Sequence, residues 1–226
     1  MDRYYYVKPA IARIKGALIR KGNNSDIIRK NINELAENEI QFIFNLAKEQ
    51  NIELFYFKRT GSLLPRVNKV LGILRGLYFE SILDVGSGRC AFLLPFMESF
   101  PNVTVKSIDI LDEKAEILQD MQNGGLENLT FSKENICDII PTEKSVDIVT
   151  LLEVLEHIPQ VEKAIENAIK IARKYVIVSV PSKEDDNEEH IHLLTKEKLT
   201  SYFNAYNISK ISFDQVHEHL IAIIKI

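Results

Sequence analysis

The residues of this chain whose types and spacing best suit chemistry lie in the segment Ile82–Ala91, ILDVGSGRCA. A β-branched run there meets Gly86 and Gly88, which let the backbone approach a ligand closely, and the helix predicted to open at this turn offers unpaired N–H groups. Asp109 follows about 21 residues after Gly88, at the end of a second apolar run, where a carboxylate can accept hydrogen bonds from both hydroxyls of a ribose. The sequence therefore predicts a site for a nucleoside-containing cofactor.

Spacing alone leaves the identity of the cofactor open, because the two glycines, Ala91 and Asp109 also fit the fingerprint of dinucleotide-binding proteins. Asp84 argues against a nicotinamide-dependent oxidoreductase. A carboxylate two residues before the first glycine would repel a pyrophosphate and attract an ammonium group. In an alternative interpretation, Asp84 only caps a neighbouring stretch of backbone.

A second group of chemically capable residues follows the fourth apolar run. His157 is the best-placed base with a pKa near neutrality, and a purely structural role for it is an equal alternative. Glu153, Glu156 and His157 stand at i, i+3 and i+4, so a helical turn would point them to one side. With His190 or His192 they could form a metal site of two carboxylates and two imidazoles, although no metal ligand is assigned on this ground alone.

Length and composition limit the class of protein. The 226 residues, 46% apolar and 27% charged, can bury one full core, which predicts one α/β domain with a small appendage. No apolar stretch approaches the roughly 20 residues of a membrane span, and the N-terminus lacks the apolar core of a signal peptide, so a cytoplasmic location is expected. Cys90 and Cys137 are too few for a disulfide framework and are interpreted as reduced, buried thiols.

The elements that must position these residues are indicated from residue 80 onward. Short apolar runs alternate with helical patterns, as in a parallel sheet of βαβ units; the runs are Ile82–Val85, Val103–Ile108, Val146–Leu151 and Tyr175–Val180. An apolar stripe over residues 161–172 predicts a crossover helix. Two final strands, Ile208–Phe213 and Glu218–Ile226, are too close in sequence for a crossover and must be antiparallel. His217 and His219 alternate there and are interpreted as a satisfied or exposed pair facing one side.

The first 80 residues differ in charge and periodicity. They hold 14 Lys and Arg against 8 Asp and Glu, whereas residues 81–226 hold 14 against 24. Helical spacing predicts helices near 4–20, 26–50 and 63–76, and hence a helical N-terminal cap over residues 1–78 and a cofactor-binding domain over residues 79–226. Ile11, Ile14 and Leu18 among basic residues predict a solvated amphipathic helix, and a basic arm that binds a polyanion is the alternative.

Residues 80–226 resemble the class I S-adenosylmethionine (SAM)-dependent methyltransferases in six segments that occur in the family's order. These segments are Leu83–Gly88 for the first motif, Ser107–Ile110 for the second, Asn135–Asp138 for the adenine-contacting loop, Ser145–Val149 for the fourth strand, Leu152–Ile158 for the stretch after it, and His190–Thr195 before the last helix and hairpin. The resemblance implies a Rossmann-like α/β fold with a seven-stranded, mostly parallel sheet, a C-terminal antiparallel hairpin and a helical N-terminal cap. That cap commonly covers the cofactor in such folds.

The resemblance also implies a role for individual residues. Its cofactor would be SAM, with the methionine end at Asp84 and the glycine turn, the ribose at Asp109, and the adenine at Asn135 and Ile136. The full set assigned to the cofactor is Asp84, Gly86, Ser87, Gly88, Asp109, Ile110, Asn135, Ile136 and Glu153, and the catalytic candidate is His157. Two positions depart from the family pattern. Cys90, expected in the first turn of a helix, replaces a third glycine, and Asn135 stands where a carboxylate is common.

The methyl acceptor is not fixed by these motifs. A small molecule is the favoured acceptor, and RNA is an alternative because of the basic N-terminal helices. The carboxylate and histidine constellation is also similar to that of small-RNA 3′-terminal 2′-O-methyltransferases, which use a divalent metal. A non-catalytic module that binds SAM or nucleic acid is a further alternative, favoured by Cys90. No membrane association is expected, and the oligomeric state is left open.

Overall fold

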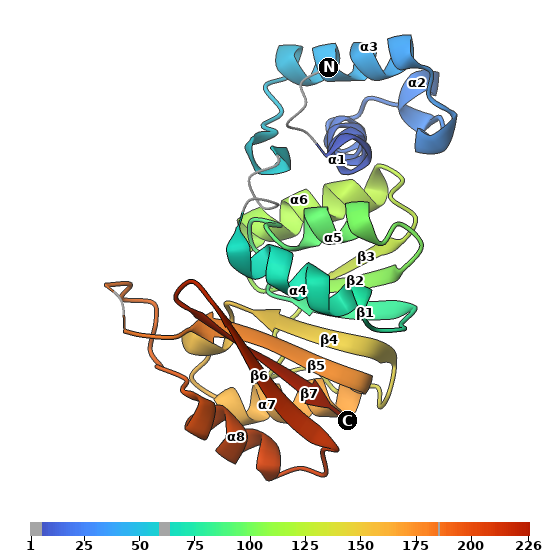
Figure 1. Ribbon diagram of the computed structural model, residues 1–226. Coiled ribbons are helices and arrows are strands. Elements are labelled where there is room, and N and C mark those ends of the chain that lie inside the picture. The colour runs from blue at the N-terminus through green and yellow to red at the C-terminus, as the bar shows by residue number, and fades with distance from the viewer. Residues whose placement is uncertain (1–5, 59–63, 185) are drawn as a thin grey trace.

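The computed structural model describes residues 6–58, 64–184 and 186–226, and its centre is one seven-stranded sheet (Figure 1). The strand order is β3-β2-β1-β4-β5-β7-β6. Strands β1 to β5 are parallel, and β7 is antiparallel to both β5 and β6. The strands are β1 Ser81–Val85, β2 Thr104–Asp109, β3 Leu129–Lys133, β4 Val146–Leu152, β5 Ala172–Pro181, β6 Lys210–Val216 and β7 His219–Lys225. The predicted mostly parallel sheet with a C-terminal hairpin is confirmed.

Helices lie on both faces of the sheet (Figure 1). On one face lie α4 (Pro65–Arg75), α5 (Leu93–Ser99) and α6 (Asp112–Asn123); on the other lie α7 (Val161–Ile171) and α8 (Lys196–Asn204). The stripe of α7 that periodicity predicted is buried, including Val161, Ala164, Ile165 and Ala168. Because both faces are covered, the central strands β1 and β4 are buried along almost their whole length instead of alternating between buried and exposed positions.

The carboxyl ends of β1, β2 and β4 form the edge at which a ligand can bind. Val85 at the end of β1 pairs with Ile108 of β2 on one side and Leu151 of β4 on the other. The chain order reverses at this point, since β2 and β3 extend the sheet one way while β4 and β5 extend it the other. Such a switch point leaves a crevice above the strand ends, which is where α/β sheets bind their ligands.

The N-terminal region forms several short helices. They are α1 Val7–Arg20, α2 Asp26–Arg29, the 3₁₀ turn η1 Ile32–Glu34, α3 Glu37–Glu49 and the 3₁₀ turn η2 Phe55–Phe57. The prediction of one helix over residues 26–50 is therefore wrong. Asn31 breaks it, because its side chain accepts a hydrogen bond from the Asn33 N–H and so stabilises a turn. Residues 4, 5 and 63 of the other two predicted helices lie outside the described residues.

The prediction that α1 is a solvated amphipathic helix is wrong. Arg13 is 8% exposed and forms ion pairs with Asp120 and Glu116 of α6, while Lys15 is 3% exposed and donates to the carbonyl of Lys30. Helix α1 lies between α6 and α3, so both of its sides meet protein (Figure 1). Its basic side chains are thus largely used inside the fold.

Helices α1 and α6 approach each other closely at two glycines. A Cβ atom built on Gly16 would overlap the backbone carbonyl of Asp120, and one built on Gly124 would overlap that of Ala12. The absence of these side chains is what allows the two backbones to touch. Among the described residues, no helix combines the length and apolar character that a membrane span requires.

Candidate functional site

The glycine turn after β1 has the open backbone that the sequence predicted, but the helix begins later. Gly86 and Gly88 have φ values of +67° and +50°, and a Cβ on Gly86 would lie 2.7 Å from a methyl group of Val154. Helix α5 starts only at Leu93, so the expectation that Cys90 lies in its first turn is wrong. Cys90 instead has φ +57°, a left-handed conformation that glycine adopts readily and other residues rarely.

The thiol of Cys90 is unreactive in this position. Its side chain is 1% exposed, and burial raises the pKa of the thiol to about 12. The thiol is therefore neutral at physiological pH and has little nucleophilic character. The cysteine alters the backbone energetics of the turn and adds no reactive group to it.

Asp84 lies at the end of β1 beneath the glycine turn and is 3% exposed. It accepts hydrogen bonds from the hydroxyls of Ser87 (2.5 Å) and Thr150 (2.7 Å). Burial raises the pKa of the carboxyl to about 6, and the two hydroxyls partly oppose that rise. The hydrogen-bond partners of Asp84 are thus side-chain hydroxyls. Its nearly buried carboxylate lines the crevice.

Asp109 fixes the shape of the turn. One carboxylate oxygen accepts from the N–H of Gly88 (2.8 Å), and the other accepts from the N–H of Leu111 (2.9 Å). Asp109 is the last residue of β2, as predicted, but it is only 5% exposed and its two hydrogen bonds hold two loops together. Each oxygen keeps lone-pair capacity for a ribose hydroxyl, since a carboxylate offers about four acceptor sites.

The predicted adenine-contacting residues lie beside Asp109. Asn135 is already engaged, because its carbonyl oxygen accepts from the N–H of Cys137 (3.0 Å) and its amide donates to Asp138 (2.9 Å). Ile136 is 2% exposed, and its backbone carbonyl accepts from Asn167 (2.7 Å). Ile110 is 59% exposed and offers an apolar surface at the rim.

Two cavities of about 400 Å³ each open along this edge and adjoin one another. The first contains Asp84 and Ser87, together with Arg66 from α4 and Arg89. The second contains the residues predicted for ribose and adenine: Asp109, Ile110, Asn135 and Ile136. Both are lined by Gly86, Gly88, Glu153 and His157. The tertiary structure thus brings every sequence-predicted site residue to one crevice.

Glu153 stands at the junction of the two cavities in an unusual conformation. Its φ is +58°, which is rare for a residue with a side chain and concentrates at functional sites. One carboxylate oxygen accepts from the Ser179 hydroxyl (2.7 Å), and the other lies 3.1 Å from Nε2 of His219 and 3.9 Å from Nε of Arg66. Burial favours the neutral acid, but these partners hold the pKa of Glu153 below its ordinary value.

Glu156 and His157 belong to a cluster of possible metal ligands that does not include Glu153. They lie in the 3₁₀ turn η4 Leu155–His157, and ligand atoms of Glu156, His157 and His190 all lie within 4.8 Å of one another. Glu153 precedes this turn and is not part of the group, because its carboxylate is held by Ser179 and His219. His192 also lies outside the cluster, with its Nε2 3.1 Å from the carbonyl of Ile158.

Glu156 is unusual among the carboxylates of this region. It is completely buried, and neither of its carboxylate oxygens has a hydrogen-bond partner among the residues that the structure describes. Burial and the nearby charge of Glu153 raise the pKa of its carboxyl to about 8, so it is mostly protonated at neutral pH. A buried group with no partner of its own is what a cation or ordered water would satisfy.

Four residues that contact the predicted site residues or line the crevice were not predicted from the sequence: Thr150, Ser179, Arg66 and His219.

The predicted same-side pair of His217 and His219 is wrong, since His217 lies in the hairpin turn with φ +27°. His219 begins β7 and pairs with Pro181 of β5, which places it beside Glu153. No local pattern carries that information, because strand register creates the contact.

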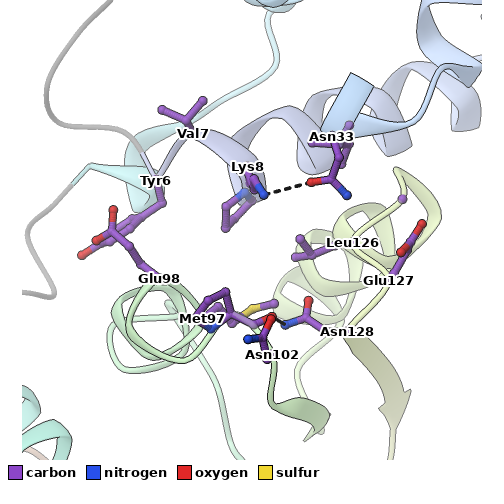
Figure 2. Close-up of a pocket in the computed structure, with 14 residues that line it drawn as sticks. Tyr6, Val7, Lys8, Asn33, Met97, Glu98, Asn102, Leu126, Glu127 and Asn128 are labelled. Carbon is purple, nitrogen blue, oxygen red and sulfur yellow. Dashed lines mark hydrogen bonds between the residues drawn. The ribbon is translucent and has the colours of Figure 1, made fainter. Parts of the chain in front are cut away.

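A separate cavity of about 590 Å³ lies away from this crevice (Figure 2). Tyr6, Lys8 and Asn33 of the N-terminal region line it opposite Met97 and Leu126, and Lys8 donates a hydrogen bond to Asn33 (2.9 Å). The loops around it precede β2 and β3, at the amino edge of the sheet. It contains no glycine turn at a strand end and none of the predicted site residues.

The fold and the crevice define a class of protein. A doubly covered parallel sheet with a closing hairpin, a glycine turn after β1 and an acidic residue after β2 is the arrangement of a Rossmann-like nucleoside-binding domain. The antiparallel end of the sheet and the buried Asp84 distinguish it from the dinucleotide-binding arrangement that the glycine spacing alone allowed.

Residues 80–220 match the family described as "Methyltransferase domain", and the chain belongs to that family. It is a SAM-dependent class I methyltransferase, as the sequence predicted. No curated protein matches the sequence.

Three solved structures illustrate the similarity of fold. A SAM-dependent methyltransferase from Aquifex aeolicus has 19% identity and a TM-score of 0.57, over 72% of this chain and 89% of that one. The methyltransferase domain of bacterial CtHen1-C has 14% identity and a TM-score of 0.58, over 71% and 96%. A "possible histamine N-methyltransferase" from Thermotoga maritima has 13% identity and a TM-score of 0.56, over 81% and 98%.

Proposed function

We propose that this methyltransferase binds SAM across the two adjoining cavities and transfers its methyl group to a small-molecule acceptor. The observation that carries the proposal is the junction of the cavities at Gly86, Gly88, Glu153 and His157. SAM has a charged methionine end and a nucleoside end joined at sulfur. The first cavity offers Asp84 for the ammonium group, and the second offers Asp109 for the ribose and Asn135 with Ile136 for the adenine.

His157 supports a role for the chain in deprotonating the acceptor. It lines both cavities, and its Nδ1 lies 2.9 Å from the carbonyl of Glu189. A carbonyl only accepts, so Nδ1 carries a proton and Nε2 is the basic nitrogen of the neutral ring. Methyl transfer from a sulfonium otherwise needs mainly alignment of donor and acceptor, which a preformed crevice supplies.

A small molecule suits the site better than RNA does. The basic residues of α1 that suggested a nucleic-acid surface are engaged with Asp120, Glu116 and the carbonyl of Lys30. The described residues of the N-terminal region up to residue 58 line neither cavity. The structurally similar Thermotoga maritima protein, described as a "possible histamine N-methyltransferase", would also act on a low-molecular-weight acceptor.

Titration calorimetry with S-adenosylhomocysteine (SAH) tests the cofactor assignment. We expect micromolar binding of SAH and none of NAD, and a large loss of affinity in Asp109→Asn, which weakens the acceptor for the ribose hydroxyls. A variant that binds SAH as tightly as the wild type would contradict the ribose assignment. For the acceptor, SAH release from SAM is measured with panels of small amines, small hydroxyl compounds and short RNAs, and turnover of RNA alone would contradict the small-molecule proposal.

A second candidate is metal-dependent methylation, which the buried and unpartnered carboxylate of Glu156 beside His157 and His190 favours. One carboxylate and two imidazoles suit a divalent transition metal such as Mn²⁺ or Zn²⁺, which would hold the oxygen of a hydroxyl acceptor. We test it by titrating Mn²⁺ into the SAH-loaded wild type and Glu156→Gln. Binding that disappears in the variant supports the metal, whereas equal binding or no binding contradicts it.

A further inference from the structure

Glu153 and His157 are the only titratable side chains among the described residues that line both cavities of the crevice. If the methionine end of SAM occupies one cavity and the nucleoside end the other, the sulfur atom lies where the cavities meet. The sulfonium carries a full positive charge in SAM and none in SAH. A fixed charge at this junction therefore distinguishes the two molecules.

The negative charge of Glu153 is held in place from three other elements. Ser179 of β5, His219 of β7 and Arg66 of α4 surround the carboxylate, at 2.7, 3.1 and 3.9 Å. The left-handed backbone at Glu153, the first residue after β4, fixes the direction in which its side chain points. A charge anchored in this way acts without reorganisation when the ligand binds.

The contacts of His219 show which form of the imidazole is present. Its Nδ1 lies 2.7 Å from the carbonyl of His217, and its Nε2 lies 3.1 Å from the carboxylate of Glu153. The partners of Glu153 hold its pKa below the ordinary value, so its carboxylate is ionised at neutral pH; because neither a carbonyl nor an ionised carboxylate can donate a hydrogen bond, both ring nitrogens carry protons. His219 is thus an imidazolium that keeps Glu153 ionised, in agreement with the raised pKa of His219.

We propose that Glu153, positioned by the imidazolium of His219, is the counter-charge of the cofactor's sulfonium and makes the site prefer SAM over SAH. This inference rests on the proposed placement of SAM. Loss of the methyl group neutralises the sulfur, so the attraction ends when the reaction is complete. Glu153 contacts the cofactor, whereas His219 is a positioning residue that acts through Glu153.

The test compares the affinities of SAM and SAH by calorimetry in five proteins: wild type, Glu153→Gln, His219→Gln, the double variant and Glu134→Gln. Glu153→Gln should lower the SAM-to-SAH affinity ratio at least about tenfold, because one charge a few ångströms away has a larger effect in a partly buried site than in bulk water. Glu134→Gln is the matched control. It removes the same charge from an exposed position that lines the nucleoside cavity but not the methionine cavity, and it should leave the ratio unchanged.

His219→Gln should lower the ratio severalfold, because the released carboxylate turns toward Arg66, and it should change nothing further when Glu153 is already glutamine. A merely structural role of His219 would weaken both ligands alike. An unchanged ratio in Glu153→Gln, or an equal effect of His219→Gln in both backgrounds, overturns the inference. Should Glu153→Gln not fold, equal wild-type affinities for SAM and SAH overturn it. Failure of the wild type to bind either ligand refutes the proposed function instead.

Discussion

Asp84→Asn should make the protein more stable and at the same time weaken cofactor binding. The carboxyl is almost fully buried, and burial raises its pKa from 3.8 to about 6. The difference of about two pKa units corresponds to about 3 kcal/mol by which the folded state disfavours the ionised form at neutral pH. Asparagine removes that charge while keeping a carbonyl oxygen for the hydroxyls of Ser87 and Thr150. Allowing for an imperfect amide fit, we expect a gain of about 1–2 kcal/mol.

The pH dependence of this gain has a definite sign. A carboxyl whose pKa is raised on folding costs no stability below its unfolded pKa, and its cost grows as pH rises through the interval from about 4 to about 6. The advantage of Asp84→Asn should therefore be complete at pH 7 and should shrink toward pH 4. Thermal unfolding at both pH values measures it. A variant that is less stable than the wild type at pH 7 would refute the argument from burial.

Cofactor affinity should change in the opposite direction. Asp84→Asn removes the charge that attracts the ammonium of the methionine moiety, so SAH affinity should fall at least tenfold at pH 7. In the wild type, affinity should fall as pH drops below about 6, because the carboxyl becomes protonated. Calorimetry with SAH at pH 7.5 and 5.5 checks both statements. A stabilised variant with unchanged SAH affinity would show that Asp84 is a structural residue.

Three further changes test other parts of the structure. Gly16→Ala should destabilise the protein by about 1–3 kcal/mol or more in chemical denaturation, because its Cβ overlaps α6. Its control Gly72→Ala in α4, where a Cβ meets nothing, should be neutral or stabilising. Asp109→Ala should lower stability by about 1–3 kcal/mol as well as SAH affinity, since it leaves two backbone N–H groups without their acceptor. Cys90 should resist a thiol reagent until the chain unfolds, and rapid labelling of native protein would contradict its burial.

The elements of this fold that could be predicted from the sequence are those whose signal is local and repetitive. The run before Gly86, the stripe of α7 and the short connection between β6 and β7 each fix an element through nearest neighbours in the chain. The ends of the elements were harder to predict. A helix was expected to begin at the glycine turn, whereas the chain continues through Cys90 in a left-handed conformation before α5 begins. Helix and strand propensities are averages over many proteins, so they do not reveal that the fold forces a single residue such as Cys90 into an uncommon backbone conformation.

The sequence by itself determined the parallel sheet with its antiparallel end and the identity of the residues at the strand ends. Hydrophobic period and connection length suffice for both, because a strand buried on two faces must be apolar and a short loop cannot cross a sheet. Only the tertiary structure decided that Glu153 contacts His219 and that the charges of α1 turn inward. These contacts join residues that are 66 or more positions apart, so they depend on strand register and helix packing, which no local pattern encodes.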